Sequence, residues 1–305
     1  MVSKFARESQ ESLVAVIGAS GFLGRWVFKK AKERFGTDRV LGVCFSKKIQ
    51  EDYVDFEEFV SKYLSKVRTL IITAGNSNHA LPHQDFEKTY LMETGYLGRI
   101  FTSGFHGHIV YLSSAAVYYG SKGIVKEQQV YPVKDEYGLA KLLAEHSLRC
   151  YIRMSASKAI VYRLMYAYGD GERPTRLLAM VKKSIKTGEV LRVYGTGTSY
   201  LNPLPAWFVA EILVRSTELV ETQTVDFDIF NLAHEQPLRV IDIVDHMKER
   251  YALKYELCGP ESYPVDFYVD VSKLRTILSK MGLAFPNVWE EITKYVEGGG
   301  EGYEK

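Results

Sequence analysis

Apolar stretches of strand length alternate with amphipathic stretches through the first half of the chain. The apolar runs are LVAVIG (13–18), RVLGVCF (39–45), TLIITA (69–74), HIVYLSS (108–114) and AIVYRLMYAYG (159–169). The stretches with apolar residues at helical period are 22–35, 56–66, 85–103 and 137–154. This alternation predicts an α/β fold, with a parallel sheet covered by helices on both faces.

The pattern loosens from about residue 170. A helical segment near 174–187 is followed by the short strand LRVYG, the turn GTGT, a helix near 206–220, the strand DIFNLA and a helix at 238–251. Short strands mixed with helices predict a smaller C-terminal lobe of mixed structure.

Composition and charge restrict the partners. The 305 residues are 46% hydrophobic and carry a formal net charge of +2, with basic residues scattered between acidic ones, so we expect no nucleic-acid or membrane partner. The cysteines Cys44, Cys150 and Cys258 lie far apart and no His cluster has metal-ligand spacing, so we expect neither a disulfide framework nor a metal site. Because no signal peptide or membrane-spanning run is recognisable, we expect a cytoplasmic protein.

A glycine-rich turn, IGASGFLG, follows the first predicted strand and precedes a helical segment. Gly18, Gly21 and Gly24 stand at points where a tight turn, the approach of a pyrophosphate to backbone N–H groups, and close helix–strand packing each exclude a side chain. The sequence therefore predicts a dinucleotide site. The residues expected at the dinucleotide phosphates are Gly18, Ser20, Gly21, Phe22, Leu23 and Gly24.

The end of the second strand bears on which dinucleotide binds. An Asp or Glu there would bind the ribose 2′-hydroxyl of NAD, but Cys44 and Phe45 stand in its place. We expect NADP(H) rather than NAD(H), because Ser46, Lys47 and Lys48 follow and suit a 2′-phosphate; the alternative is that both lysines are ordinary solvated charges. The other expected cofactor contacts are Asp55 and Phe56 at the adenine, and Thr73, Ala74 and Gly75 beneath the cofactor.

Tyr137 and Lys141 stand four residues apart at the start of a helical segment. Residues at i and i+4 share a helix face, so the ammonium can approach the phenol. A nearby cation stabilises the phenolate and moves the tyrosine pKa from about 10 toward the neutral range, where it can exchange protons. A hydroxyl that contacts both the substrate oxygen and the phenol would complete the site, and a serine at the end of the fourth strand can supply it.

The motifs GASGFLG, LSSAAVYYG and YGLAK, in this order, resemble those of the extended short-chain dehydrogenase/reductase family, which are NAD(P)-dependent nucleotide-sugar epimerases, dehydratases and reductases. The resemblance continues through RLMYAYGDGERP and VYGTGTSYLNPLPAWFVAEIL to YVDVSKL. It implies a doubly wound parallel (Rossmann) sheet with a smaller mixed C-terminal substrate lobe. We expect an NAD(P)-binding domain over 1–168, to which residues of about 202–235 are candidates to return, and a mainly substrate-binding lobe over 169–305.

The resemblance also implies residue roles. The Ser–Tyr–Lys triad is carried over as Ser114, Tyr137 and Lys141, with the tyrosine exchanging a proton with a sugar oxygen while hydride moves to or from nicotinamide. Additional cofactor contacts are Leu112, Tyr137, Lys141 and Tyr166. The expected substrate contacts are Asn76, Ser114, Tyr166 and Asn202. Relatives form homodimers through a four-helix bundle, so we expect a homodimer.

Two departures from the family pattern narrow the chemistry. Ala115 and Ala116 stand where many members have a Thr or an acidic pair, which argues against dehydration. Leu201 stands where an arginine usually grips the nucleotide-sugar pyrophosphate, so a bidentate phosphate contact is missing. The candidates to replace that arginine are Arg173, Arg176 and Lys182.

The sequence thus predicts an NAD(P)-dependent epimerase or keto-reductase acting on a nucleotide-linked or otherwise activated sugar. GVCFSKK resembles the 4-keto-sugar reductase branch, whereas usage across the family favours an epimerase. Two alternatives remain: a non-catalytic NADP(H)-binding regulator on the same fold, and a reductase of a small carbonyl compound, which the leucine at 201 motivates.

Overall fold

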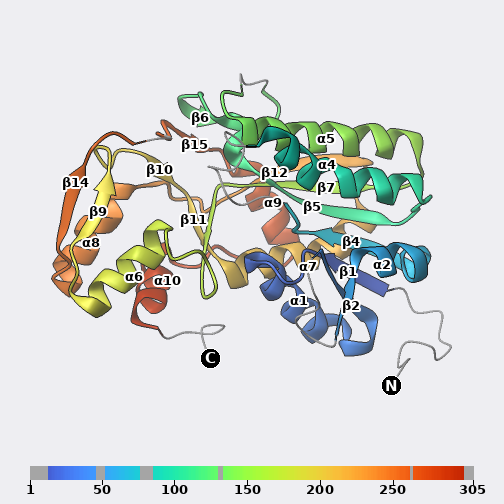
Figure 1. Ribbon diagram of the computed structural model, residues 1–305, viewed down its shortest axis with the longest axis horizontal. Helices are drawn as coiled ribbons and strands as arrows, with labels where there is room; N and C mark the ends of the chain where they lie inside the picture. Colours follow the sequence, from blue (N-terminus) through green and yellow to red (C-terminus); the bar gives the residue numbers. More distant parts are fainter. Residues whose placement is uncertain (1–12, 46–51, 76–84, 130–132, 262–263, 299–305) are drawn as a thin grey trace. The chain divides into compact units, whose positions relative to one another are not determined.

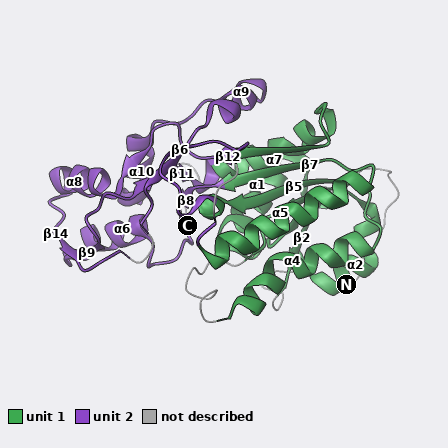
Figure 2. Ribbon diagram, turned by 90° about the horizontal axis from the view of Figure 1, so that it is seen from above, with its two compact units in different colours: residues 1–117, 135–163, 209–230 green, residues 118–134, 164–208, 231–305 purple. Residues whose placement is uncertain are grey.

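The computed structural model describes residues 13–45, 52–75, 85–129, 133–261 and 264–298 (Figure 1). The chain divides into two compact units. Unit 1 comprises residues 1–117, 135–163 and 209–230, and unit 2 comprises residues 118–134, 164–208 and 231–305, drawn green and purple in Figure 2.

A seven-stranded sheet forms the centre of unit 1, in the order β12-β7-β5-β4-β1-β2-β3. Its strands are β1 Leu13–Ile17, β2 Val40–Cys44, β3 Tyr53–Asp55, β4 Val67–Ile72, β5 His108–Ser114, β7 Ala159–Leu164 and β12 Phe227–Leu232. β1 pairs in parallel with both β2 and β4, so Ile17 lies opposite Val43 on one side and Ile72 on the other. The predicted doubly wound parallel sheet is confirmed.

Helices cover both faces of this sheet, as Figure 1 shows. α1 (Phe22–Phe35) and α7 (Ala206–Thr222) cover one face, and α2 (Phe56–Lys62), α4 (Phe86–Thr102) and α5 (Glu136–Met154) cover the other. The second face is closed by apolar residues of α4 and α5 that pack in one cluster with alternate strand residues. That cluster includes Leu97, Ile100, Ala144, Leu148, Ile17, Leu41 and Ile72.

Two predicted elements are interrupted. The helix expected over 56–66 ends at Lys62, and a 3-10 turn, η2 (Leu64–Lys66), follows before β4. The strand expected over 159–169 is two strands: β7 ends at Leu164, and β8 (Tyr166–Tyr168) pairs instead with β11 (Pro203–Pro205) in unit 2. A continuous apolar run therefore supplies strands to two different sheets.

Strand order fixes where a ligand can bind in unit 1. From β1 the chain continues to β2 and β3 on one side, while β4 leads to β5 on the other. In open α/β sheets the crevice at such a switch point, outside the carboxyl ends of the strands, is the ligand site. Here that position lies after Ile17 and Ile72, where the glycine-rich turn and the segment Thr73–Gly75 begin.

Unit 2 is a mixed lobe of short elements. Its helices are α6 Leu177–Thr187, α8 Val240–Tyr251, α9 Ser272–Lys280 and α10 Val288–Glu297. Besides β8 and β11, its strands form the parallel pairs β6 (Gly123–Val125) with β15 (Phe267–Val269) and β9 (Leu191–Tyr194) with β14 (Tyr255–Cys258), and the antiparallel pair β10 (Tyr200–Leu201) with β13 (Leu238–Arg239). Among the helices that the structure describes, none is long and apolar enough to cross a bilayer.

Candidate active site

The glycine-rich turn between β1 and α1 leaves no room for a side chain at Gly18 or Gly24. Gly18 has φ +88°, and a Cβ there would lie 2.7 Å from the backbone nitrogen of Ala74. A Cβ on Gly24 would lie 1.9 Å from the carbonyl oxygen of Gly18. Gly21 is the N-cap of α1, and no acidic residue stands in the first turn of that helix. The turn therefore presents the positive end of α1 at the switch point, as binding of a dinucleotide phosphate requires.

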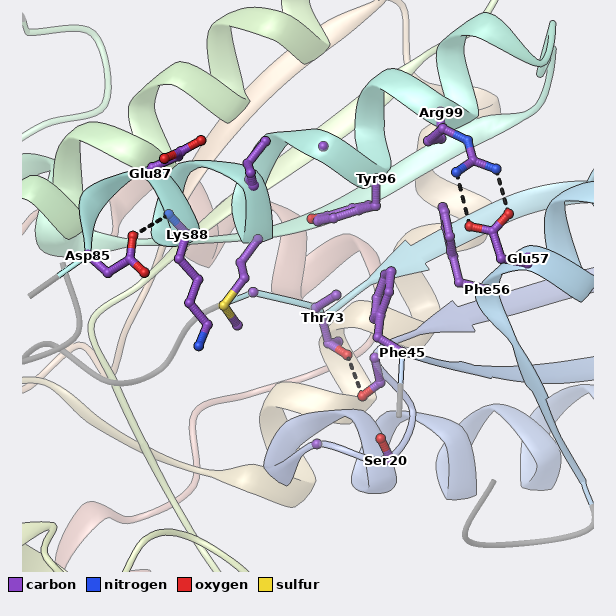
Figure 3. Close-up of a pocket in the computed structure, with 17 residues that line it drawn as sticks. Ser20, Phe45, Phe56, Glu57, Thr73, Asp85, Glu87, Lys88, Tyr96 and Arg99 are labelled. Carbon is purple, nitrogen blue, oxygen red and sulfur yellow. Dashed lines mark hydrogen bonds and ion pairs between the residues drawn. The ribbon is translucent and has the colours of Figure 1, made fainter. Parts of the chain in front are cut away.

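A cavity of about 940 Å³ opens at this point of unit 1 (Figure 3). Many of the residues expected to contact the cofactor line it together. These are Gly18, Ser20, Gly21, Phe56, Thr73, Ala74 and Gly75. The Thr73 hydroxyl donates to the carbonyl oxygen of Ile17 at 3.1 Å and so ties the end of β4 to the end of β1.

An aromatic cluster forms one wall of the cavity. The rings of Phe45 and Phe56 stack with centroids 4.8 Å apart, and Tyr96 on α4 approaches Phe45 at 5.6 Å. Figure 3 shows the Phe45 ring beside Phe56, toward Thr73. Phe45 stands directly after β2, in the place of the acidic residue that binds a ribose, and this position is the sequence signal for its contact with the cavity. Tyr96 was missed because only packing of α4 against the sheet brings it here.

Charged residues form the rim. The Arg99 guanidinium donates to both carboxylate oxygens of Glu57, at 3.0 and 2.6 Å, and this pairing lowers the pKa of Glu57 (Figure 3). These partners stand 42 residues apart in the sequence, so no local pattern indicates the pair. The lining residues that sequence analysis did not select are Phe45, Glu57, Asp85, Glu87, Lys88, Leu91, Met92, Gly95, Tyr96 and Arg99.

The other expected cofactor and substrate residues lie elsewhere. Asp55 is the N-cap of α2, and its carboxylate accepts from the backbone N–H of Glu58 at 2.9 Å. Phe22, Leu23 and Gly24 belong to the first turn of α1 and do not line the cavity. Ser46, Lys47, Lys48 and Asn76 lie outside the described residues.

Ser114, Tyr137 and Lys141 come together within unit 1. Ser114 ends β5, and Tyr137 stands in the first turn of α5, which begins after the N-cap Asp135. The side chains of Tyr137 and Ser114 share a hydrogen bond. One turn further along α5, Lys141 is buried, and its ammonium lies 3.4 Å from the carbonyl oxygen of Leu112 on β5.

The pKa of Tyr137 lies above its ordinary value near 10.0, which is the opposite direction from that expected from the Tyr–Lys spacing alone. Burial of the phenol is the largest cause. The Lys141 cation and the Ser114 hydrogen bond lower the pKa, but the carboxylate of Glu93 raises it. The role of Glu93 could not be predicted from the sequence, because a glutamate in the middle of an amphipathic helix normally faces solvent.

Two other hydroxyl groups of the stretch LSSAAVYYG, those of Ser113 and Tyr118, have structural partners. The Ser113 hydroxyl donates to Glu145 at 2.5 Å, and the Arg163 guanidinium donates to the same carboxylate at 2.7 Å. In unit 2, the Tyr118 hydroxyl donates to Asn231 at 2.7 Å. These contacts are consistent with packing roles for Ser113 and Tyr118.

Tyr166 and Asn202, the remaining expected contacts, belong to unit 2. The Arg176 guanidinium lies 4.3 Å from the centre of the Tyr166 ring. Arg176 also pairs with the buried Glu172 at 3.1 Å, so it is already engaged within unit 2. Asn202 is fully buried, and its amide donates to the carbonyl oxygen of His234 at 2.9 Å.

Comparisons with known proteins agree with this architecture. MoeE5 in complex with UDP-glucose and NAD superimposes with TM-score 0.82 and 18% identity, over 94% of this chain and 98% of that one. The UDP-N-acetylglucosamine 4-epimerase from Methanobrevibacter ruminantium M1, in complex with UDP-N-acetylmuramic acid, gives TM-score 0.80 and 14% identity over 94% and 97%. A mutant UDP-glucuronic acid 4-epimerase from Bacillus cereus, in complex with NAD and UDP-4-deoxy-4-fluoro-glucuronic acid, gives 0.78 and 16% over 93% and 96%.

Sequence identities this low establish only a shared fold. The family assignment rests instead on the match of the sequence to a family model. Residues 14–202 match the family model described as the NAD dependent epimerase/dehydratase family. The match begins in β1, includes the glycine-rich turn, Ser114, Tyr137 and Lys141, and ends next to β10. The chain therefore belongs to the NAD dependent epimerase/dehydratase family.

Proposed function

We propose that this protein is a nicotinamide-dependent enzyme that exchanges hydride and a proton with a nucleotide-linked sugar, as an epimerase or a keto-reductase. The observation that carries the proposal is the buried Tyr137, which shares a hydrogen bond with Ser114 and has the Lys141 ammonium on the same helix face. A module that only binds a dinucleotide does not need these three groups together.

The residues at the switch point fit a nicotinamide dinucleotide. Side chains are excluded at Gly18 and Gly24, and the N-terminus of α1 supplies partial positive charge for a pyrophosphate. The exposed ring of Phe45 offers a flat apolar surface beside the cavity, suitable for an adenine. When bound, the dinucleotide supplies the hydride acceptor or donor.

Three residues of the chain are proposed to transfer the proton and to position the groups that exchange it. Tyr137 gives its hydroxyl proton to a substrate carbonyl oxygen in the reductive direction, or takes the proton of a substrate hydroxyl in the oxidative direction. Ser114 orients that oxygen through its hydroxyl, and Lys141 stabilises the phenolate that remains after donation. Ala115 and Ala116 offer no acid or base, which supports reduction or epimerisation over dehydration.

The proposed cofactor is NAD, in keeping with the description of the family and with the NAD in MoeE5. NADP is the second candidate, on a specific observation. β2 ends at Cys44, whose thiol donates to Val54, and Phe45 follows, so the described end of this strand offers no carboxylate for a ribose 2′-hydroxyl.

The proposed substrate is a UDP-sugar, the ligand class of the solved relatives. Leu201 remains in the place of the expected phosphate-binding arginine, and it pairs with Leu238 in the β10–β13 ribbon. The neighbouring pair in the same ribbon joins Tyr200 to Arg239, an exposed cation that can serve a diphosphate instead.

We also propose a homodimer formed through α4 and α5. Both helices belong to unit 1 and carry large apolar side chains that are exposed in the single chain. Those outside the lining of the cavity are Phe86, Tyr90, Leu139 and Leu143. Exposed apolar residues gathered on two packed helices are typical of a protein–protein interface.

A substrate panel tests the proposed function. The purified protein is incubated with UDP-glucose, UDP-glucuronic acid, UDP-N-acetylglucosamine and a small ketone, each with NAD(H) or NADP(H), and the products are identified by mass spectrometry and NMR. Conversion of a UDP-sugar that Tyr137→Phe abolishes supports the proposal. Conversion of the small ketone alone would transfer the chemistry to a different substrate class, and turnover equal in wild type and Tyr137→Phe would refute the assigned proton donor.

A further inference from the structure

Glu93 forms a buried ion pair with Lys141. The carboxylate Oε2 lies 2.8 Å from the ammonium Nζ, and the two side chains are 0% and 5% exposed, respectively. Glu93 comes from α4 and Lys141 from α5, so the pair joins the two helices that cover this face of the sheet. Two charges buried together carry a desolvation cost, so the pair is not explained by a gain in stability alone.

The ion pair lies against the wall of the cofactor cavity. Gly75, three residues after the end of β4, lines that cavity and has φ +147°. A Cβ on Gly75 would lie 2.6 Å from Oε2 of Glu93 and 2.8 Å from Nζ of Lys141. The carboxylate and the ammonium therefore sit directly behind the backbone that the cofactor is expected to contact.

The position of the ammonium is restricted by its contacts. A protonated lysine has three N–H donors. The Nζ of Lys141 forms an ion pair with the Glu93 carboxylate of α4 at 2.8 Å and donates to the Leu112 carbonyl oxygen of β5 at 3.4 Å. The aromatic ring of Tyr111 lies 5.3 Å from the same nitrogen. The lysine is thus held between α4 and β5.

We propose that Glu93 is a positioning residue, which fixes the Lys141 ammonium and, by neutralising it, keeps the proton on Tyr137. An ammonium whose charge is balanced by a neighbouring carboxylate stabilises a phenolate less than an unpaired ammonium does. Before substrate binds, Tyr137 is therefore a neutral phenol that can donate its proton. In a reduction, the O–H bond of Tyr137 would break as its proton passes to a substrate carbonyl oxygen, and the carbonyl carbon would accept the hydride that a bound reduced nicotinamide dinucleotide supplies. A protonated Tyr137 favours reduction of the substrate. This catalytic role of Glu93 rests on the proposed function.

Other charged and titratable groups lie around Tyr137 and Lys141. Burial raises the pKa of Tyr137 most, Lys141 lowers it and Glu93 raises it. Charged and titratable groups also face the pair from the neighbouring elements. They are Tyr96 on α4, Tyr111 on β5, Asp135 at the start of α5, and Glu145 on α5 with its partner Arg163 on β7.

The test measures the Tyr137 proton directly, without substrate. Protein labelled with ¹³Cζ-tyrosine is titrated by NMR, and the Tyr137 signal is the one missing from Tyr137→Phe. In Glu93→Gln the pKa of Tyr137 should fall by about one pH unit, the lower end of the effect of a nearby charge. In Glu93→Asp, whose carboxylate is retracted by one methylene, it should fall by less. An unchanged or higher pKa in Glu93→Gln overturns the proposal, and if that variant does not fold, an unchanged pKa in Glu93→Asp does so.

Glu145→Gln is the matched control, because it also removes a buried carboxylate from an ion pair on this face of the sheet, and because Glu145 acts on Lys141 and is not among the groups that shift the pKa of Tyr137. It should leave the Tyr137 pKa within a fraction of a unit of wild type. A shift as large as that of Glu93→Gln would mean that the loss of any buried charge changes the Tyr137 pKa, and it would overturn the specific role of Glu93. With a converted substrate, the high-pH loss of kcat in the reductive direction should move down by the same interval in Glu93→Gln. If no nucleotide-sugar is converted, the proposed function fails while the NMR result still decides the role of Glu93.

Discussion

Gly24→Ala tests whether the glycine-rich turn is built for close packing and phosphate binding. A Cβ at this position would lie 1.9 Å from the carbonyl oxygen of Gly18 and 2.7 Å from its carbonyl carbon. Non-bonded heavy atoms rest at about 3.5 Å, so the start of α1 must move by roughly 1.5 Å. Overpacking of this kind costs about 1–3 kcal/mol, which exceeds the ~1 kcal/mol that alanine gains over glycine in a helix.

The displacement also moves the backbone N–H groups at the start of α1. A hydrogen bond of normal length is lost when its atoms separate by roughly another 1.5 Å, and a bond to a charged group contributes about 1.5–3 kcal/mol. Gly24→Ala should therefore bind NAD at least about tenfold more weakly than wild type and unfold at a lower denaturant concentration. Titration calorimetry with NAD and urea unfolding measure the two effects.

Gly98→Ala, on α4, is the matched control, since a Cβ at this position would meet no atom within 4 Å. It should bind NAD like wild type and gain up to about 1 kcal/mol of stability from helix propensity. Wild-type affinity and stability in Gly24→Ala would refute the packing argument. Equal losses in both variants would show that any alanine in these helices is harmful.

Three further predictions follow from charge and exposure. Glu145→Ala leaves the buried Arg163 without its carboxylate and should cost about 3–5 kcal/mol in urea unfolding; a loss below about 1 kcal/mol would contradict the network. Burial raises the pKa of Glu172 to about 7, so the folded protein binds an extra proton between pH 4.5 and 7, and stability should fall by about 3 kcal/mol as the pH rises through that window. Glu172→Gln should remove that decline, and denaturant unfolding at pH 5 and pH 8 checks it. Leu143→Asp should convert the proposed dimer to a monomer in sedimentation velocity, and a wild type that is already monomeric would exclude the α4–α5 interface.

Local sequence patterns were enough to predict the fold and the glycine-rich turn. Alternating strand and helix periods identified the elements of the sheet, and the spacing of Gly18, Gly21 and Gly24 identified the turn, because both depend on residues close together in the sequence. The breaks at Lys62 and Leu164 escaped prediction because apolar runs do not reveal which sheet a strand joins.

Interactions across elements could not be predicted in the same way. Glu93 reaches Lys141 only because α4 and α5 pack side by side in one register. The net pKa shift of Tyr137 depends on burial and on this carboxylate, neither of which the Tyr–Lys spacing contains. Phe45 and the Glu57–Arg99 pair complete the cavity through contacts of the same long-range kind.

Hydride transfer between a nucleotide-sugar and the bound nicotinamide is the central claim. It is measured by the absorbance at the reduced-nicotinamide band after each UDP-sugar, or its 4-keto form, is added to protein loaded with NAD⁺ or NADH. The account predicts a change in that band with at least one nucleotide-sugar in wild type, and none in Tyr137→Phe with the same sugar still bound. Binding of nucleotide-sugars with no change in the band for any of them would contradict it.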